Sequence, residues 1–124
     1  MKSRILVVNA DQNETDSIGN TLRRAGFSPC VIVNLEGVED AIASNNCVAV
    51  LLDLDSIAVS NRTVRRLTLQ FPRVCFLCTS GSPFHPGLED AIGLYFYACI
   101  QKPIDPDELL YWLKCIHSNM EEKA

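Results

Sequence analysis

The sequence predicts a three-layer α/β fold, in which five parallel strands form one doubly wound sheet with helices on both faces. Short apolar runs of strand length alternate five times with amphipathic segments, and this alternation is typical of consecutive parallel βαβ units. The runs are apolar at nearly every position, as expected of strands that are buried on both faces. A length of 124 residues and a hydrophobic content of 48% suit one compact domain, which we expect to span residues 1–124.

The strands are expected where apolar residues follow one another without a charged residue. Residues 5–8 (Ile-Leu-Val-Val) give the first, and residues 48–52 (Val-Ala-Val-Leu-Leu) give the most apolar of the five. The complete set of expected strands is 5–8, 30–33, 48–52, 74–78 and 97–100.

The helices are expected between the strands, where apolar residues recur at a spacing of three or four. Ile18 and Leu22 form such a stripe in the first helix, and Gly26 is expected to end it. Asp105 is expected to cap the last helix, with Pro106 at its first position. The expected helices are 14–24, 37–44, 61–70, 88–94 and a last one from 106 through at least 116, and the Gly- and Pro-rich segment 81–87 is expected to be a loop.

The charge and the apolar pattern exclude two classes of partner. A net charge of −4 argues against direct nucleic-acid binding, which requires a basic surface. The longest nearly apolar run, residues 91–100, is about half of the roughly 20 residues that span a bilayer. Only four apolar residues follow the basic N-terminal start, too few for a secretory signal. We therefore expect no membrane partner and a cytoplasmic location.

The six cysteines are interpreted as reduced structural thiols, because nearly all of them lie inside apolar runs. They are Cys30, Cys47, Cys75, Cys78, Cys99 and Cys115. Cys75 and Cys78 form a C-x-x-C pattern, which can indicate a redox pair or half of a zinc site. In a strand, however, positions three apart face opposite sides, so we expect this pair not to act together.

Three polar side chains follow different strands of the predicted sheet at the edge where ligands bind in parallel α/β folds. Asp53 ends the third strand, Thr79 follows the fourth and Lys102 follows the fifth. A carboxylate can accept a phosphoryl group, while an ammonium and a hydroxyl can hold its oxygens. The three residues therefore suit a phosphoryl-accepting site.

On these residues the sequence resembles the receiver domain of response regulators in two-component, or phosphorelay, signal transduction. Val50-Leu51-Leu52-Asp53 resembles the phosphoacceptor strand, Leu77-Cys78-Thr79-Ser80 the hydroxyl strand and Gln101-Lys102-Pro103 the Lys-Pro motif. The separations of 26 residues from Asp53 to Thr79 and 23 from Thr79 to Lys102 fit the family as well. The resemblance covers essentially the whole chain. It implies a CheY-like, flavodoxin-like fold, a phosphoacceptor role for Asp53, phosphoryl contacts from Thr79 and Lys102, and no enzymatic role.

The sequence departs from this family where receivers have two acidic residues that hold Mg²⁺. The corresponding residues are Asn9 and Ala10, which together provide one neutral side-chain oxygen. Mg²⁺ requires hard oxygen ligands in octahedral geometry, so we expect its binding to be weak or absent and Asp53 to be a vestigial phosphoacceptor. Asp11 and Asp55 are, with Asp53, the remaining candidates for a metal ligand.

A second departure concerns Cys99, which stands three residues before Lys102 at the position where receivers have a switching aromatic residue.

Tyr111 and Trp112 are adjacent on the last helix, so at least one of them should face outward and could anchor a contact.

We therefore predict an atypical receiver domain that acts through protein–protein contacts. The expected partners are a histidine kinase or another signalling protein, and a second copy bound through the fourth helix, fifth strand and fifth helix. In this hypothesis Lys102 neutralises Asp53 directly and so favours one conformation. One alternative is a conventional receiver phosphorylated on Asp53 by a histidine kinase. A more remote one is a flavin- or nucleotide-binding domain, although residues 9–13 lack a glycine-rich phosphate loop.

Overall fold

The fold is described from a computed structural model, which describes residues 3–82 and 88–122. Five strands form one parallel sheet in the order β2-β1-β3-β4-β5, which is the predicted fold class. The strands are β1 (Arg4–Val8), β2 (Ser28–Ile32), β3 (Ala49–Asp53), β4 (Cys75–Ser80) and β5 (Ala98–Gln101). The helices are α1 (Gln12–Arg24), α2 (Val38–Asn45), α3 (Asn61–Gln70), α4 (Glu89–Leu94) and α5 (Pro106–Glu122).

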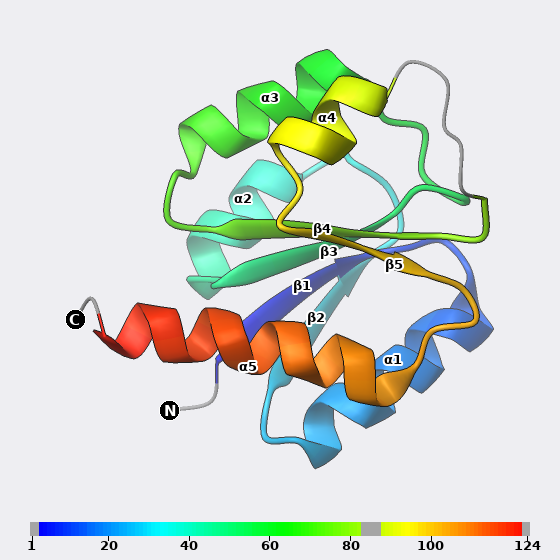
Figure 1. Cartoon of the computed structure of the whole chain (residues 1–124), viewed down its shortest axis with the longest axis vertical. Helices are drawn as coiled ribbons and strands as arrows, with labels where there is room; N and C mark the ends of the chain where they lie inside the picture. Colours follow the sequence, from blue (N-terminus) through cyan, green and yellow to red (C-terminus); the bar gives the residue numbers. More distant parts are fainter. Residues whose placement is uncertain (1–2, 83–87, 123–124) are drawn as a thin grey trace.

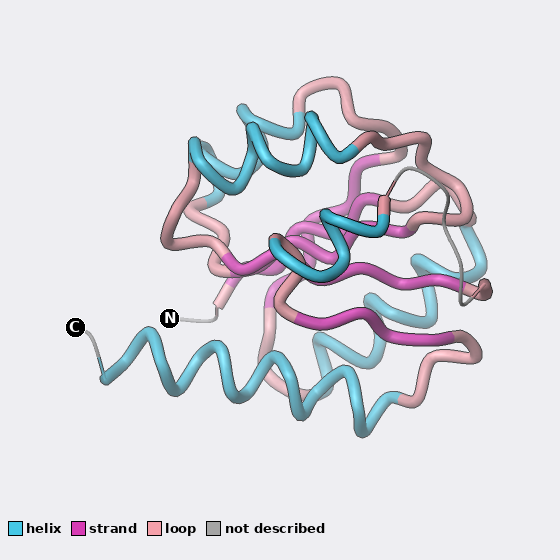
Figure 2. Tube along the Cα trace, turned by 45° about the horizontal axis from the view of Figure 1, so that its top comes forward, coloured by secondary structure: helices cyan, strands magenta, loops and turns pink. Residues whose placement is uncertain are grey.

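The helices cover both faces of the sheet, with α1 and α5 on one face and α2, α3 and α4 on the other (Figure 1). Successive strand residues enter different cores, because side chains alternate along a strand. Leu51 packs into the core under α1 and α5, whereas the neighbouring Leu52 packs into the core under the other three helices. Figure 2 shows the strands running between these two layers of helices. Burial on both faces explains why the strands are apolar at nearly every position.

The strand register places the functional candidates along one edge. Asp53 at the end of β3 is the register partner of Thr79 on β4, and β5 ends one residue before Lys102. The β4 strand continues to Ser80, two residues beyond the predicted end, so Thr79 lies within the strand and is held by its ladder. The other strands differ from their predicted bounds by one or two residues.

Local side-chain bonds explain where the helices begin and end. The α1 helix begins at Gln12, two residues earlier than predicted, because the Asp11 carboxylate accepts a hydrogen bond from the Glu14 N–H at 3.1 Å. Gly26 follows the end of α1 with φ of 90°, as predicted for a C-terminal glycine. The Asp105 carboxylate accepts a bond of 2.9 Å from the Asp107 N–H, which confirms its predicted capping role. Within the predicted loop 81–87, residues 83–87 lie outside the described residues.

No helix in the two described segments is long and apolar enough to cross a membrane.

Five of the six cysteines are buried or partly buried, as expected of structural thiols, and one is exposed. Cys75 and Cys78 lie against different cores, on opposite faces of β4, so the C-x-x-C pattern does not bring their thiols together. Cys47 and Cys78 are buried, and all six cysteines are free thiols. The exception is Cys99, which is exposed although the apolar run around it predicted burial. The cause is its place on β5, which is an outer strand of the sheet.

The outer strands limit how the sheet can be extended. β2 and β5 each pair with one neighbour, so each has a free edge. Pro29 lies within β2 as the register partner of Ile5. A proline has no backbone N–H to donate, and within sheets it is tolerated on an edge strand of this kind.

We expect Leu77→Ala to lower the free energy of unfolding by about 2–5 kcal/mol, because it removes a fully buried side chain and leaves a cavity. Leu69→Ala is the matched control, since Leu69 on α3 is 66% exposed and should change stability by less than about 0.5 kcal/mol. Urea unfolding followed by circular dichroism measures both values. Equal destabilisation by the two variants would contradict this description of the core.

Candidate functional site

The three side chains predicted to form a site meet at Asp53, which is only 1% exposed. The Thr79 hydroxyl donates to Asp53 Oδ1 at 2.9 Å, and Lys102 Nζ contacts the same oxygen at 2.8 Å. β3, β4 and the segment after β5 supply the three residues, and their parallel arrangement brings these positions to one edge. The geometry therefore brings together the three residues that the sequence identified.

Ser56, which the sequence analysis did not identify, holds the other oxygen of Asp53. Its hydroxyl donates to Asp53 Oδ2 at 2.6 Å, and its backbone N–H donates to the same oxygen at 3.1 Å. The Asp-x-x-Ser spacing favours such a turn after a strand, so this signal was present in the sequence. Both carboxylate oxygens of Asp53 are thus engaged by neighbouring residues.

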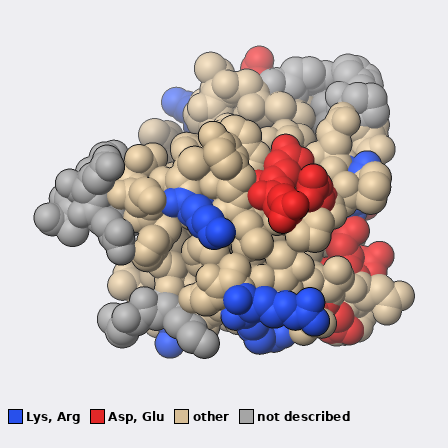
Figure 3. Space-filling view, turned by 60° about the horizontal axis from the view of Figure 1, so that its bottom comes forward, with Lys and Arg blue, Asp and Glu red and all other residues tan. Residues whose placement is uncertain are grey.

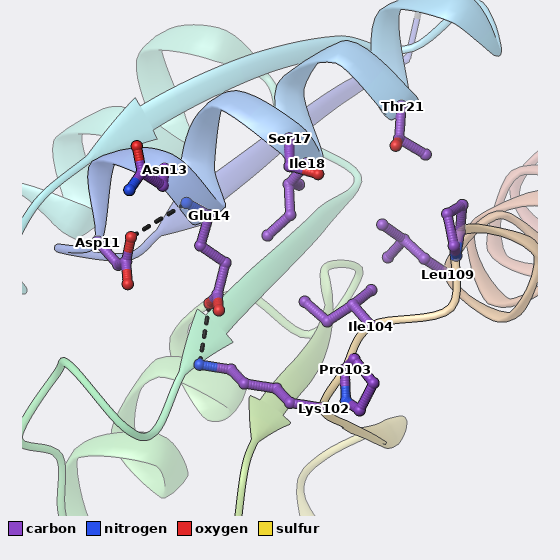
Figure 4. Close-up of a pocket in the computed structure, with 11 residues that line it drawn as sticks. Asp11, Asn13, Glu14, Ser17, Ile18, Thr21, Lys102, Pro103, Ile104 and Leu109 are labelled. Carbon is purple, nitrogen blue, oxygen red and sulfur yellow. Dashed lines mark hydrogen bonds and ion pairs between the residues drawn. The ribbon is translucent and has the colours of Figure 1, made fainter.

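Lys102 is the centre of a cluster of four charged groups. Besides Asp53, its Nζ contacts Glu14 Oε1 at 2.9 Å and Asp55 Oδ2 at 2.9 Å. Glu14 is the second residue that the sequence analysis missed. It enters the site from the first turn of α1, and its carboxylate points toward the Lys102 ammonium in Figure 4. One ammonium therefore bonds to three carboxylates from three different segments of the chain.

This cluster favours the charged forms of Asp53 and Lys102. Burial alone would raise the pKa of Asp53, but hydrogen bonds from Lys102, Ser56 and Thr79 outweigh it and hold that pKa below its usual value. Burial likewise opposes the charge on Lys102, yet its contacts with Asp53, Asp55 and Glu14 raise the pKa of the amine above its usual value. At neutral pH the two residues form an ion pair.

Asn9 and Ala10, the residues at the positions of the acidic pair, take part in a neutral network beside this cluster. The buried Asn9 donates through Nδ2 to Glu14 Oε1 at 2.7 Å, while its Oδ1 accepts from the Asp11 N–H at 2.8 Å. The Ala10 N–H donates to the Ser56 hydroxyl oxygen at 3.0 Å. Asn9 thus orients Glu14 toward Lys102.

The two other acidic candidates behave differently. Asp11 is an exposed cap on α1, and its Oδ1 accepts from the Glu14 N–H. Asp55 reaches the cluster, where its Oδ2 accepts from the Gly81 N–H at 2.8 Å in addition to the contact with Lys102. The structure therefore brings Asp55 to the site and uses Asp11 at the start of the neighbouring helix.

A groove of about 420 Å³ adjoins the cluster between α1 and the segment that leads from β5 into α5. Glu14 and Lys102 line it on one side, and Ile18 and Leu109 provide apolar lining further along (Figure 4). Asp53 does not line this groove. The groove therefore borders the charged cluster without opening onto the buried carboxylate.

An aromatic cluster lies on α5 and beside β5. The Trp112 ring makes T-shaped contacts with Tyr97, at a centroid distance of 5.8 Å, and with Tyr111, at 5.1 Å. Tyr111 is 60% exposed, so one of the adjacent aromatic residues faces outward, as the sequence predicted. Exposed Leu94 at the end of α4 adds a further apolar side chain to the same region of the chain.

The charges visible on one face of the molecule form separate patches of either sign. Figure 3 shows the basic and acidic side chains gathered in small groups, with uncharged surface between them. The net charge of the chain is −4. This face therefore has no broad basic field of the kind that nucleic-acid phosphates require.

Known structures share this fold from end to end. A response regulator receiver domain protein (CheY-like) from Methanospirillum hungatei superposes with a TM-score of 0.86 at 18% identity, covering 100% of both chains. The signal receiver domain of an HD domain-containing protein from Pseudomonas fluorescens gives 0.85 at 18% identity, over 98% of this chain and 99% of that one. A receiver domain (CheY-like) from Methylobacillus flagellatus gives 0.78 at 23% identity, over 94% and 99%. No protein-family model and no curated protein matches the sequence. The chain thus has the CheY-like fold.

The charged cluster predicts that Lys102→Met lowers the free energy of unfolding by about 3 kcal/mol at neutral pH, because three carboxylates then face one another without a counter-charge. The folded-state pKa of Asp53 is lowered, so its contribution is present above the unfolded-state pKa of about 3.9 and is lost as the pH falls through the lower folded value. The deficit of the variant should therefore shrink below about pH 4.

Urea unfolding at neutral pH and at about pH 3 measures this difference. Lys114→Met is the matched control, since Lys114 is an exposed lysine on α5 and should cost less than about 0.5 kcal/mol at either pH. A Lys102→Met variant as stable as Lys114→Met at neutral pH would contradict the description of the cluster.

Proposed function

We propose that this protein is an atypical receiver domain of two-component signal transduction, which acts through protein–protein contacts rather than through efficient phosphorylation. One observation carries the proposal: the Lys102 ammonium is bonded to Asp53, Asp55 and Glu14 at 2.8–2.9 Å. In a receiver that accepts a phosphoryl group, the equivalent lysine is needed for a phosphoryl oxygen. Here its three donors already have partners within the protein.

The donor set around Asp53 does not fit Mg²⁺. The positions of the acidic pair provide one amide oxygen, on Asn9, and that oxygen accepts the Asp11 N–H. Two of the carboxylates that could have approached a cation, Asp53 and Asp55, instead neutralise an ammonium. A strict octahedral cation would have to displace Lys102 and recruit ligands from a neutral network.

In the proposed mechanism, the Lys102 ammonium takes the place of Mg²⁺ as the cation beside Asp53. Lys102 follows β5, Asp53 ends β3, and Glu14 lies on α1, so the ion pairs connect these three elements. The ion pair between Lys102 and Asp53 already connects the end of β5 to β3, so this connection does not require a phosphoryl group. The domain would then present one fixed surface to a histidine kinase, to another signalling protein or to a second copy, without enzymatic activity.

The surface proposed for such contacts lies on α4, β5 and α5. Among the described residues, six large apolar side chains are exposed. Three of these, Leu94, Tyr97 and Tyr111, belong to this region, and the rings of Tyr97 and Tyr111 both contact Trp112. Exposed aromatic residues supported by a neighbouring ring are typical anchors of protein interfaces. The exposed aliphatic and aromatic side chains of this surface support the proposal that it binds a protein partner.

We expect the double variant Asn9→Asp/Ala10→Asp to bind Mg²⁺ at least about tenfold more tightly than the natural sequence, because two carboxylates replace one neutral oxygen. Isothermal titration calorimetry measures the affinities. Beryllofluoride, which mimics a phosphoryl group on an aspartate, should alter the amide NMR spectrum of the double variant in the presence of Mg²⁺. The same addition should leave the natural sequence almost unchanged.

A triple variant that also carries Asp53→Asn is the control, and it should not respond to beryllofluoride. Strong Mg²⁺ binding by the natural sequence, with a beryllofluoride response that Asp53→Asn removes, would overturn the proposal in favour of a conventional receiver. A bound flavin or nucleotide in the purified protein would instead favour the remote alternative.

If a second copy binds at this surface, we expect a homodimer that the double variant Leu94→Ser/Tyr111→Ser weakens at least about tenfold, because it removes two exposed apolar side chains. Sedimentation velocity over a range of concentrations measures the dissociation constant. Val33→Ser/Leu69→Ser is the matched control, because it removes two exposed apolar side chains from other elements. A protein that stays monomeric at the highest concentration would rule out the second copy as the partner at this surface.

A further inference from the structure

Two cysteines lie side by side on neighbouring strands, close to the charged cluster but outside it. Cys78 on β4 is the register partner of Cys99 on β5. Register partners on adjacent strands point to the same face, and neighbouring strands are about 4.8 Å apart. This spacing lies within the Cα separation of about 4.4–6.8 Å that a disulfide spans. Sequence spacing gave no sign of the pair, because 21 residues separate its members.

The two thiols shift each other's pKa, and their environments differ. Cys78 is fully buried in the core under α2, α3 and α4, whereas Cys99 is exposed. The interaction with Cys99 and, second, burial favour the protonated form of Cys78, so the pKa of its thiol is raised. The same interaction lowers the pKa of Cys99 to about 7, against the opposing effects of partial burial and of the Glu108 charge. The pair thus combines an accessible thiolate with an adjacent protonated thiol.

The other buried and half-buried cysteines lack this combination. Cys75 lies on the opposite face of β4 from Cys78. Cys47 is buried, and the loss of solvation raises the pKa of its thiol to about 11. Cys30 and Cys115 are only partly buried, but neither is a register partner of another cysteine. An oxidant should therefore react with Cys99 faster than with the other cysteines.

We propose that Cys99 is an oxidation site for hydroperoxides and that Cys78 resolves the oxidised product as an intramolecular disulfide. The Cys99 thiolate attacks the terminal oxygen of the hydroperoxide, the O–O bond breaks, and one water or alcohol leaves after it takes up a proton. Cys78 then attacks the sulfur of the resulting sulfenic acid, forms the S–S bond and releases water. In sum, the two thiols lose two protons and two electrons, which reduce the hydroperoxide to an alcohol or water and a further water.

The disulfide would connect the strand that carries Thr79 to the strand that leads into Lys102. Thr79 follows Cys78 directly on β4, and Lys102 lies three residues beyond Cys99. A covalent bond between the two strands restricts the movement of β5 relative to β4 at this point. The proposal does not depend on the signalling function, because it concerns only the chemistry of the two thiols.

The test treats the reduced, folded protein with hydrogen peroxide at neutral pH in the presence of a chelator. The reaction is then stopped in denaturant with N-ethylmaleimide, and thiols released by a reductant are labelled with iodoacetamide and located by tandem mass spectrometry. We expect Cys78 and Cys99 to be the first residues to carry the second label, in equal amounts. With half of Cys99 ionised at pH 7, and allowing for the weaker nucleophilicity of a less basic thiolate, its oxidation should be roughly three- to fivefold faster than that of an ordinary thiol of pKa about 8.5.

Three variants separate this mechanism from unspecific oxidation. Cys99→Ser should abolish the second label on Cys78, whereas Cys78→Ala should leave a sulfenic acid on Cys99 that dimedone traps. Cys115→Ser is the matched control and should leave the disulfide unchanged. Circular dichroism checks that each variant folds. If the substitution of the buried Cys78 prevents folding, the Cys99→Ser variant decides the test, because Cys99 is exposed. Oxidation of other cysteines before this pair, or persistent labelling of Cys78 in Cys99→Ser, would overturn the proposal.

Discussion

The structure of the site depends on one ammonium group held among three carboxylates. Glu14, Asp53 and Asp55 come from α1, β3 and the turn after β3, and the Lys102 ammonium that contacts all three offsets the repulsion between their charges. Asp53 is nearly inaccessible to solvent, so its charge would be costly to bury without this partner. The same bonds raise the pKa of the amine and lower that of the aspartate, so each group keeps the other charged.

The sheet and the three central residues of the site could be predicted from the sequence for one physical reason. In a parallel sheet that is buried on both faces, strands are continuous apolar runs, and their carboxyl ends meet at a common edge. Residues that follow three such runs, Asp53, Thr79 and Lys102, must therefore lie near one another. Their contacts at 2.8 and 2.9 Å follow from the register of β3 and β4 and from the short step after β5.

Glu14 and Ser56 were not predicted as site residues, because a helix start and a turn, rather than a periodic pattern, place them beside Lys102 and Asp53. Glu14 reaches Lys102 because the Asp11 cap starts α1 at Gln12, two residues before the predicted start, and Glu14 lies in the first turn of the helix. Ser56 meets Asp53 because the chain turns back after β3, and the Asp-x-x-Ser spacing that favours this turn is a short local signal rather than a periodic one. The exposure of Cys99 had a similar cause, since a strand of the same composition is buried at the centre of a sheet and open at its edge.

The proline on β2 bears on how the molecule avoids aggregation. An outer strand with a complete row of unpaired backbone groups can add strands from other chains, and the process can repeat. Pro29 removes one donor from that row near the start of the strand, so an incoming parallel strand would lack a bond where its ladder should begin. A chain that associates through its other side, on α4, β5 and α5, could thus form a closed pair while uncontrolled growth of the sheet at β2 stays unfavourable.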